Sequence, residues 1–129
     1  MNTATTAIGQ FPAHMDAAET RICNLLITVI FEAGYAIRVR CGEEGDVFVE
    51  ATTDRAAIQK ETAATGATYY DVMSYNAHPG KMVRVGTIWL VHGNGCDLIS
   101  DTSWPENAPE NEAIIEAVCK PAQQLANTF

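Results

Sequence analysis

Apolar residues near the start of the chain recur at helical spacing. From Ile22 onward they fall at i, i+3, i+4, i+7, i+8 and i+11, which places them on one face of a helix. Asp16 and Glu19 favour the positive N-terminal end of a helix, and Gly34 can end it in the left-handed conformation. The pattern predicts an amphipathic helix over residues 15–33.

Alternation of apolar and polar residues follows this helix. The run YAIRVRC, residues 35–41, places an apolar stripe on one face and two arginines on the other, the pattern of a half-buried strand. GEEGD turns the chain into a second strand, VFVEA, and TTDRAAIQKETAATG predicts a short surface helix that Gly66 ends. Three more strands are expected, over 68–76, 82–92 and 96–100.

Turn-forming residues separate the last three strands. AHPG, residues 77–80, and the pair Asn94-Gly95 each favour a tight turn, so the three strands should form a meander. Gly86 interrupts the middle strand, which indicates a bulge or the close approach of another part of the backbone.

The C-terminal part of the chain is typical of a loop followed by a helix. DTSWPENAPENE, residues 101–112, contains two prolines and many capping residues, and Asn107 with Glu110 resembles a capping box. The helix is expected from about Pro109. Pro121 should end or kink it, because proline lacks the backbone N–H and clashes with the preceding turn.

The predicted elements follow the order α-β-β-α-β-β-β-α. Because tight turns can join only antiparallel neighbours, the sheet should be mostly antiparallel, with helices packed against it. A length of 129 residues and a 47% apolar composition suit one hydrophobic core, and no linker or repeat divides the chain. We therefore expect a flexible N-terminal arm over 1–14 and a single α+β domain over 15–129.

The charge balance narrows the classes of partner. Sixteen acids against eight basic residues give a net charge of −8, so the average field repels nucleic acid and anionic membranes. No apolar run reaches the roughly 20 residues that a membrane span needs, and no basic and apolar leader is visible. We expect a cytoplasmic protein without direct nucleic-acid or membrane contact.

The cysteines Cys23, Cys41, Cys96 and Cys119 include no closely spaced pair. Zinc sites built from cysteine normally take their ligands in such pairs, and disulfides are typical of exported chains. Four reduced thiols, and no metal or other cofactor, are therefore expected.

One stretch, VHGNGCDLISDTSW at 91–104, gathers residue types that do chemistry. If the Gly-Asn-Gly turn is tight, His92 and Cys96 become cross-strand neighbours, and the imidazole could activate the thiol. The alternative is that both only flank a hairpin, which the absence of an orienting third group favours. Asp97 and Asp101 would stand about 13 Å apart on one strand face, too far to share a cation.

Motifs of the common enzyme classes are missing from the sequence. No P-loop, G-x-S-x-G or H-E-x-x-H pattern occurs, and the GNG run lacks the third glycine of a dinucleotide fingerprint. His14 and His78 have no ligand partner at helical spacing, and we expect both as solvated loop residues. A non-enzymatic protein is therefore predicted.

Acidic residues are concentrated near the C-terminal loop. Between Asp97 and Glu116 there are six acids and no Lys or Arg. Such a surface can steer a basic partner, and Trp104 beside Pro105 is either an exposed anchor or a lid on the core. The alternative is a solvated loop leading into a helix whose dipole favours acids. The predicted partner-binding residues are Asp97, Asp101, Trp104, Glu106, Glu110 and Glu112.

Two runs, AGYAIRVRCGEEGDVFVEATTDRAAI and VRVGTIWLVHGNGCDLISDTS, resemble a group of small uncharacterised proteins of phages, prophages and plasmids of proteobacteria. In that group a strand like AGYTISV, a helix start like STDRAAI and a hairpin like GWV-LVYGN-DVISDYT occur in the same order. The likeness covers about residues 33–103. His92 stands where Tyr is usual, and Thr102-Ser103 departs from YT. The resemblance implies a mobile-element origin and carries no activity with it.

Together these observations predict a small acidic interaction protein of a phage or other mobile element. Its sharpest form is an inhibitor of a host defence system, of the anti-CRISPR or anti-restriction type. Such an inhibitor would bind a host or viral protein with a basic surface and occlude a nucleic-acid-binding surface. Two alternatives stay open. One is a small hydrolase or transferase using His92, Cys96 and Asp97; the other is a homo-oligomeric accessory protein that pairs through a strand edge or through Trp89 and Trp104.

Overall fold

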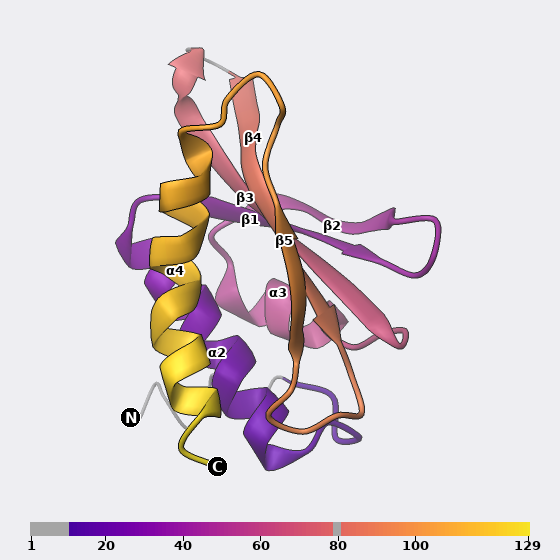
Figure 1. The fold of residues 1–129 in the computed structure, drawn as a ribbon. Helices are drawn as coiled ribbons and strands as arrows, with labels where there is room; N and C mark the ends of the chain where they lie inside the picture. The colour runs from indigo at the N-terminus through magenta and orange to yellow at the C-terminus, as the bar shows by residue number, and fades with distance from the viewer. Residues whose placement is uncertain (1–10, 79–80) are drawn as a thin grey trace, which may run out of the picture.

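Helices and strands follow one another in the predicted order. The fold is that of a computed structural model, which describes residues 11–78 and 81–129, with the backbone alone at 76–78. The elements in this part of the chain (Figure 1) are α2 (Ala17–Glu32), β1 (Ala36–Cys41), β2 (Asp46–Thr52), α3 (Arg55–Glu61), β3 (Ala67–His78), β4 (Lys81–Val91), β5 (Ile99–Ser103) and α4 (Asn111–Ala126). The strands form one antiparallel sheet in the order β2-β1-β3-β4-β5, so the α+β class is confirmed.

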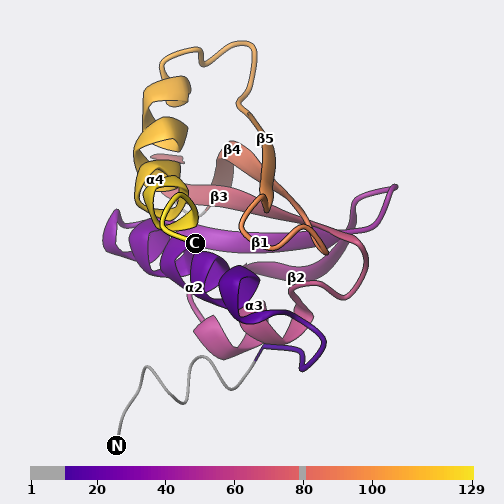
Figure 2. The ribbon, with the colours of Figure 1, turned by 60° about the horizontal axis from the view of Figure 1, so that its bottom comes forward.

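The helices of the described residues pack against one side of the sheet. α2 and α3 lie below it in the view of Figure 2, and α4 packs on α2 and on β4. Apolar side chains from strands and helices meet in the layer between them. The largest fully buried ones are Ile22, Leu26, Ile27, Ile30, Ile37, Ile58, Tyr70, Ile88, Leu90, Leu98 and Ile115. No helix of the described residues covers the other face of the sheet, which we call the uncovered face.

Side-chain alternation separates the two faces of the sheet. In β1, Ile37 and Val39 are fully buried in the core. Arg38 and Arg40 alternate with them and therefore point to the uncovered face. The half-buried strand that the alternation of YAIRVRC predicts is confirmed.

The ends of α2 are fixed by the residues that the sequence indicates. Asp16 caps the first turn, because its Oδ1 accepts the backbone N–H of Glu19 at 2.8 Å. Gly34 follows the helix with a φ of +93°, a left-handed conformation that glycine adopts without a steric penalty.

The helix α3 is shorter than predicted, since it ends at Glu61 and not at Gly66. Thr62 leaves the helix in an extended conformation, and its hydroxyl lies 2.6 Å from that of the buried Tyr70. Ala63 then takes a left-handed φ of 63°, which costs a non-glycine residue about 1–2 kcal/mol. Tertiary contacts after Glu61 therefore set this boundary, and local propensity could not reveal them.

The connection between β4 and β5 is longer than the predicted turn. β4 ends at Val91 and β5 begins only at Ile99. The physical reason is Leu98, which is fully buried and draws the chain into the core before the strand begins. His92 and Cys96 both lie in this connection, so they are not the cross-strand neighbours that a tight turn would make of them.

The helix α4 also differs from its predicted bounds. It begins at Asn111, whose Nδ2 donates to the carbonyl of Val85 at 3.0 Å, and Glu110 makes no side-chain cap bond, so the predicted capping box is absent. Pro121 lies inside the helix, which continues to Ala126. Burial of neighbouring side chains holds this turn despite the lost hydrogen bond. These neighbours are Val118, Cys119 and Ala122.

Part of the predicted N-terminal arm lies against the domain. Residues 1–10 are outside the described part of the chain. Phe11 is buried in the core, and Nε2 of His14 lies 3.0 Å from the carbonyl oxygen of Ala63. Residues 11–14 therefore pack on the fold that follows them.

β3 and β4 form the long hairpin at the centre of the sheet. Residues 79–80 of the predicted AHPG turn, and the side chain of His78, lie outside the described residues. The register shifts next to Gly86, so the predicted bulge is confirmed. A β-carbon at this glycine would lie 2.5 Å from Cδ1 of Ile115, so the backbone also makes the close approach that the sequence indicates.

Gly86→Ala should lower the free energy of unfolding by about 1–3 kcal/mol, because the new methyl group overlaps Ile115 and the carbonyl of Ser103. Gly66→Ala is the matched control, since nothing lies within 4 Å of its β-carbon. It should change the free energy of unfolding by less than about 1 kcal/mol. Urea unfolding followed by circular dichroism measures both variants, and equal effects would contradict the close packing at Gly86.

Candidate functional site

The uncovered face carries an unbroken row of paired residues that runs from one edge of the sheet to the other. Each member is the direct cross-strand partner of the next, so the side chains share this face. From β2 to β5 they are Val47, Arg40, Tyr69, Trp89 and Asp101. We call this set the outer row.

Contacts along the outer row form an aromatic platform. The guanidinium carbon of Arg40 lies 5.0 Å from the centre of the Tyr69 ring, a cation–π contact. The centre of the Tyr69 ring lies 5.6 Å from that of Trp89, with 39° between the ring planes. Trp89 is 39% exposed and Val47 is 46% exposed. The outer row therefore presents aromatic and apolar surface to solvent.

A second group of residues beside the outer row is built around a buried carboxylate. Asp71 in β3 is fully buried. Its oxygens accept hydrogen bonds from Nε of Arg38 at 2.7 Å, from Nε and Nη2 of Arg40 at 2.7 and 2.8 Å, and from the hydroxyl of Thr87 at 2.7 Å. Thr87 in turn accepts a hydrogen bond from Nη1 of Arg84 at 2.9 Å. We call the three arginines around Asp71 the arginine cluster.

The arginine cluster keeps Asp71 ionised. Burial raises the pKa of this carboxyl group, but hydrogen bonds from Arg40, Thr87 and Arg38 together lower it more, so the pKa lies below its ordinary value of 3.8. The same contact raises the pKa of Arg40, against a smaller opposing effect of burial. Asp71 is therefore an anion at neutral pH, and the cluster keeps its three positive charges.

This part of the uncovered face is basic in a chain that is acidic overall. Arg38 and Arg40 bond to one carboxylate and Arg84 bonds to the threonine beside it, whereas the whole chain has a net charge of −8. The alternation of YAIRVRC places Arg38 and Arg40 on one face, but it does not show that Asp71 and Arg84 reach the same spot. The available signal was a single acid in TYYDVM, an otherwise aromatic and apolar strand.

A hollow of about 130 Å³ lies at the β5 end of the outer row. It is lined by Arg40, Tyr69, Trp89, Asp101 and Ser103, among others. Pockets for small ligands usually span about 300–1,000 Å³. This hollow is therefore suited to one side chain of a partner rather than to a cofactor.

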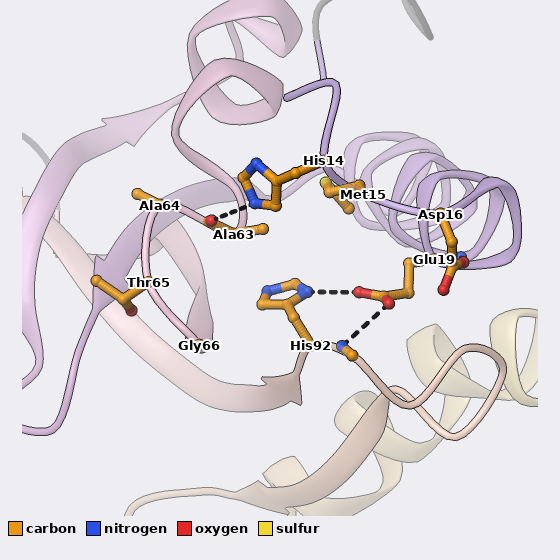
Figure 3. A pocket seen from close by; sticks show the side chains of 10 residues that line it. His14, Met15, Asp16, Glu19, Ala63, Ala64, Thr65, Gly66 and His92 are labelled. Carbon is orange, nitrogen blue, oxygen red and sulfur yellow. Dashed lines mark hydrogen bonds and ion pairs between the residues drawn. The ribbon is translucent and has the colours of Figure 1, made fainter.

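On the helical side of the sheet, three polar side chains form a buried chain of hydrogen bonds. Nδ1 of His92 lies 2.9 Å from Oε1 of Glu19, whose Oε2 accepts the N–H of Gly93 at 3.1 Å (Figure 3). Nε2 of His92 lies 2.7 Å from the hydroxyl of Thr68, which accepts the N–H of Ala63 at 2.9 Å. Because a carboxylate can only accept, Nδ1 of His92 is the donor in its bond to Glu19.

The order hydroxyl, imidazole, carboxylate is that of a hydrolase triad, but the hydroxyl here is out of reach. Thr68 is fully buried. It does not line the neighbouring pocket of about 460 Å³, whose walls include His14, Asp16 and His92 (Figure 3). The chain of hydrogen bonds therefore joins α2, β3 and the β4–β5 connection, and it does not present a nucleophile to a substrate.

The contact between His92 and Cys96 that a tight Gly-Asn-Gly turn would create is absent. Both ring nitrogens of His92 are bonded, to Glu19 and to Thr68, so neither is available to the thiol. Cys96 is exposed and lines, with Asp97, a separate hollow of about 140 Å³. This geometry does not support the hydrolase or transferase alternative built on His92, Cys96 and Asp97.

The predicted partner-binding acids lie between the β4–β5 connection and the first turn of α4. Trp104 is half-buried, so it is neither a freely exposed anchor nor a fully covered lid. The acids are all exposed, and we call them the acidic ridge: Asp97, Asp101, Glu106, Glu110 and Glu112. Their role in binding stays a prediction.

Two common kinds of functional feature are absent from the part of the chain that the structure describes. Among the described residues, no three His, Cys, Asp or Glu side chains are grouped so that they could hold a metal ion. No helix in this part of the chain is both long and apolar enough to cross a membrane. Comparison with known proteins finds no matching family model, no similar curated protein and no similar solved structure.

Asp71→Asn should lower the free energy of unfolding at neutral pH by about 2–4 kcal/mol, because an amide cannot replace four accepted hydrogen bonds or balance the guanidinium charges. The lowered pKa of Asp71 means that its carboxylate stabilises the fold above pH 3.8, and this contribution is lost as the pH falls below that value. The difference between wild type and variant should therefore shrink as the pH falls below 3.8. Urea unfolding at each pH measures it.

Glu50→Gln is the matched control for this experiment, because it neutralises an exposed acid on β2. It should change the free energy of unfolding by less than about 0.5 kcal/mol at any pH. A destabilisation by Asp71→Asn that stayed constant with pH would contradict the role assigned to the carboxylate.

Cys96 should be the one thiol that reacts rapidly with Ellman's reagent in the native protein, since it is exposed. Burial raises the pKa of Cys23 and Cys41, and that of Cys119 to about 12, which suppresses the reactive thiolate at these three positions. They should react only after unfolding. Cys96→Ser should remove the rapid phase, whereas Cys119→Ser should keep it. A second rapid thiol would contradict the burial of the other three.

Proposed function

We propose that this chain is a protein-binding module that holds its partner on the uncovered face of the sheet. The observation that carries the proposal is the outer row, in which Arg40, Tyr69 and Trp89 lie side by side on three adjacent strands. Arg, Tyr and Trp are the residue types most enriched among those that dominate binding energy at protein interfaces. Val47 and Asp101 extend the same row to its apolar and acidic ends.

The order already present on this face supports the proposal. Two hydrogen bonds to Asp71 and the ring of Tyr69 hold Arg40, so it loses little freedom when a partner binds. Tyr69 and Trp89 contact each other, and each has only two side-chain torsions to fix. A surface ordered in advance converts more of its contact energy into affinity.

The proposed partner is a protein of a host cell. This step rests on the resemblance of residues 33–103 to proteins of phages, prophages and plasmids, which favours a mobile-element origin. The narrower proposal is inhibition of a host defence system, of the anti-CRISPR or anti-restriction type, inside the host cytoplasm. Such an inhibitor needs a rigid binding face that occludes a surface of its target, and it needs no chemistry of its own.

The acidic ridge has a separate role in the proposal. It borders the uncovered face at β5, where Asp101 belongs both to the ridge and to the outer row. Charges at the rim of an interface mainly raise the association rate with a partner of opposite charge. The ridge would therefore guide a basic region of the partner, and the outer row would hold another part of it.

Trp89→Ala should remove most of the affinity for the protein that the tagged chain captures from a proteobacterial lysate. Truncation of a central aromatic anchor costs at least about 2 kcal/mol, which is roughly a 30-fold rise in Kd. Isothermal titration calorimetry with the purified captured protein measures the Kd, and circular dichroism checks that the variant folds.

The matched control is the triple ridge variant Glu106→Gln, Glu110→Gln and Glu112→Gln. It should keep the Kd within about threefold and slow association at low salt. If the ridge variant loses the partner while Trp89→Ala keeps it, the interface is the acidic ridge and the proposal is wrong. Recovery of no partner by the wild-type chain also overturns it.

A further inference from the structure

We infer that the arginine cluster is an oxyanion site that binds the carboxylates of an acidic segment of the partner protein, while an apolar side chain of the same segment sits beside Tyr69 and Trp89. This inference rests on the proposed function and adds the chemistry of the partner. It is carried by the hydrogen-bonding capacity, the charge and the surroundings of the cluster.

Several N–H groups of the arginine cluster have no hydrogen-bond acceptor among the described residues. Each guanidinium carries five N–H groups. Within the described residues, Arg38 bonds to Asp71 through Nε alone, and Arg84 bonds to Thr87 through Nη1 alone. The side chains of Arg38 and Arg40 are 29% and 27% exposed. The arginine cluster therefore keeps N–H groups that water or a partner can reach from the uncovered face.

The buried carboxylate cannot satisfy these donors. Asp71 already accepts four hydrogen bonds with its two oxygens, which matches the lone-pair capacity of a carboxylate. Its one negative charge also faces three positive charges. Asp71 instead holds the guanidinium groups of Arg38 and Arg40 in place directly, and it holds Arg84 through Thr87. Arginines fixed in this way are suited to two-point contacts with a carboxylate.

The surroundings favour a short acidic protein segment over a nucleic acid strand. A nucleic acid would place phosphates at regular intervals across the face. Asp101 ends the outer row at β5, and the acidic ridge continues beyond it, so a long polyanion meets repulsion there. A short segment can place one or two carboxylates on the arginine cluster and one apolar side chain in the hollow of about 130 Å³ beside Trp89.

Fluorescence anisotropy with synthetic probes tests this inference. The probe is a labelled short peptide in which glutamates flank a central leucine. The comparison probes are the same peptide with glutamines and a labelled single strand of thymidines. At low ionic strength the wild-type chain should bind the glutamate peptide at least about tenfold more tightly than either comparison probe.

Variants of the cluster separate its charge from its structural role. Arg84→Gln should weaken binding of the glutamate peptide about tenfold without unfolding the chain, because Arg84 reaches Asp71 only through Thr87. Arg38→Gln should weaken it similarly, and its urea unfolding is measured alongside because it loses a direct bond to Asp71. Lys120→Gln removes the same charge from an exposed position on α4 and should leave binding unchanged.

Equal binding of the glutamate and glutamine peptides, or unchanged binding by Arg84→Gln, overturns the inference. The inference is also overturned if the wild-type chain binds the thymidine strand more tightly than the glutamate peptide and Arg84→Gln abolishes that binding. This result would assign the cluster to nucleic acid. These failures differ from a failure of the proposed function, which is decided by Trp89→Ala and the captured partner. If Trp89→Ala loses the captured partner while Arg38→Gln and Arg84→Gln bind the glutamate peptide as wild type does, the inference fails and the proposed function stands.

Discussion

The buried carboxylate of Asp71 is the constraint on which the uncovered face depends. A charge removed from water is tolerated only when it is paired and hydrogen bonded, and its partners here come from the two strands that flank β3. A shift of β3 by one residue would turn Asp71 toward the apolar core and leave the arginines of β1 without their anion. One carboxylate thus fixes the register of three strands and the orientation of the arginines.

Polar groups on the two faces of the sheet differ in how completely they are satisfied. On the helical side, Glu19, His92 and Thr68 bond to one another and to nearby backbone N–H groups, and the side chains are nearly closed off from solvent. On the uncovered face, Arg38 and Arg84 keep donors that no described residue accepts. In a structural network the polar groups usually accept and donate all their hydrogen bonds within the protein. Donors without an acceptor are typical of a surface that binds a partner. The uncovered face is therefore the side of the sheet with free capacity to bind a partner.

The sequence predicts what local patterns control and misses what distant contacts control. The order of elements, the helix stop at Gly34 and the bulge at Gly86 follow from periodicity and glycine chemistry, and the structure has all three. The delayed start of β5 depends on the burial of Leu98, which no local pattern reveals. The arginine cluster could not be predicted from the sequence for the same reason. Arg38 and Asp71 are 33 positions apart, and they meet only when the strand register is known.

The bond between Glu19 and His92 also affects when α2 gains its contacts during folding, because it joins residues 73 positions apart. Contacts of such separation form late in folding, since the entropy of closing a long loop opposes them. Of the described helices, a ribosome makes α2 before the others, so its first turn stays without this bond until β4 and the residue after it have been synthesised. Among the described helices, α2 therefore gains this contact only after the central hairpin of the sheet has been synthesised.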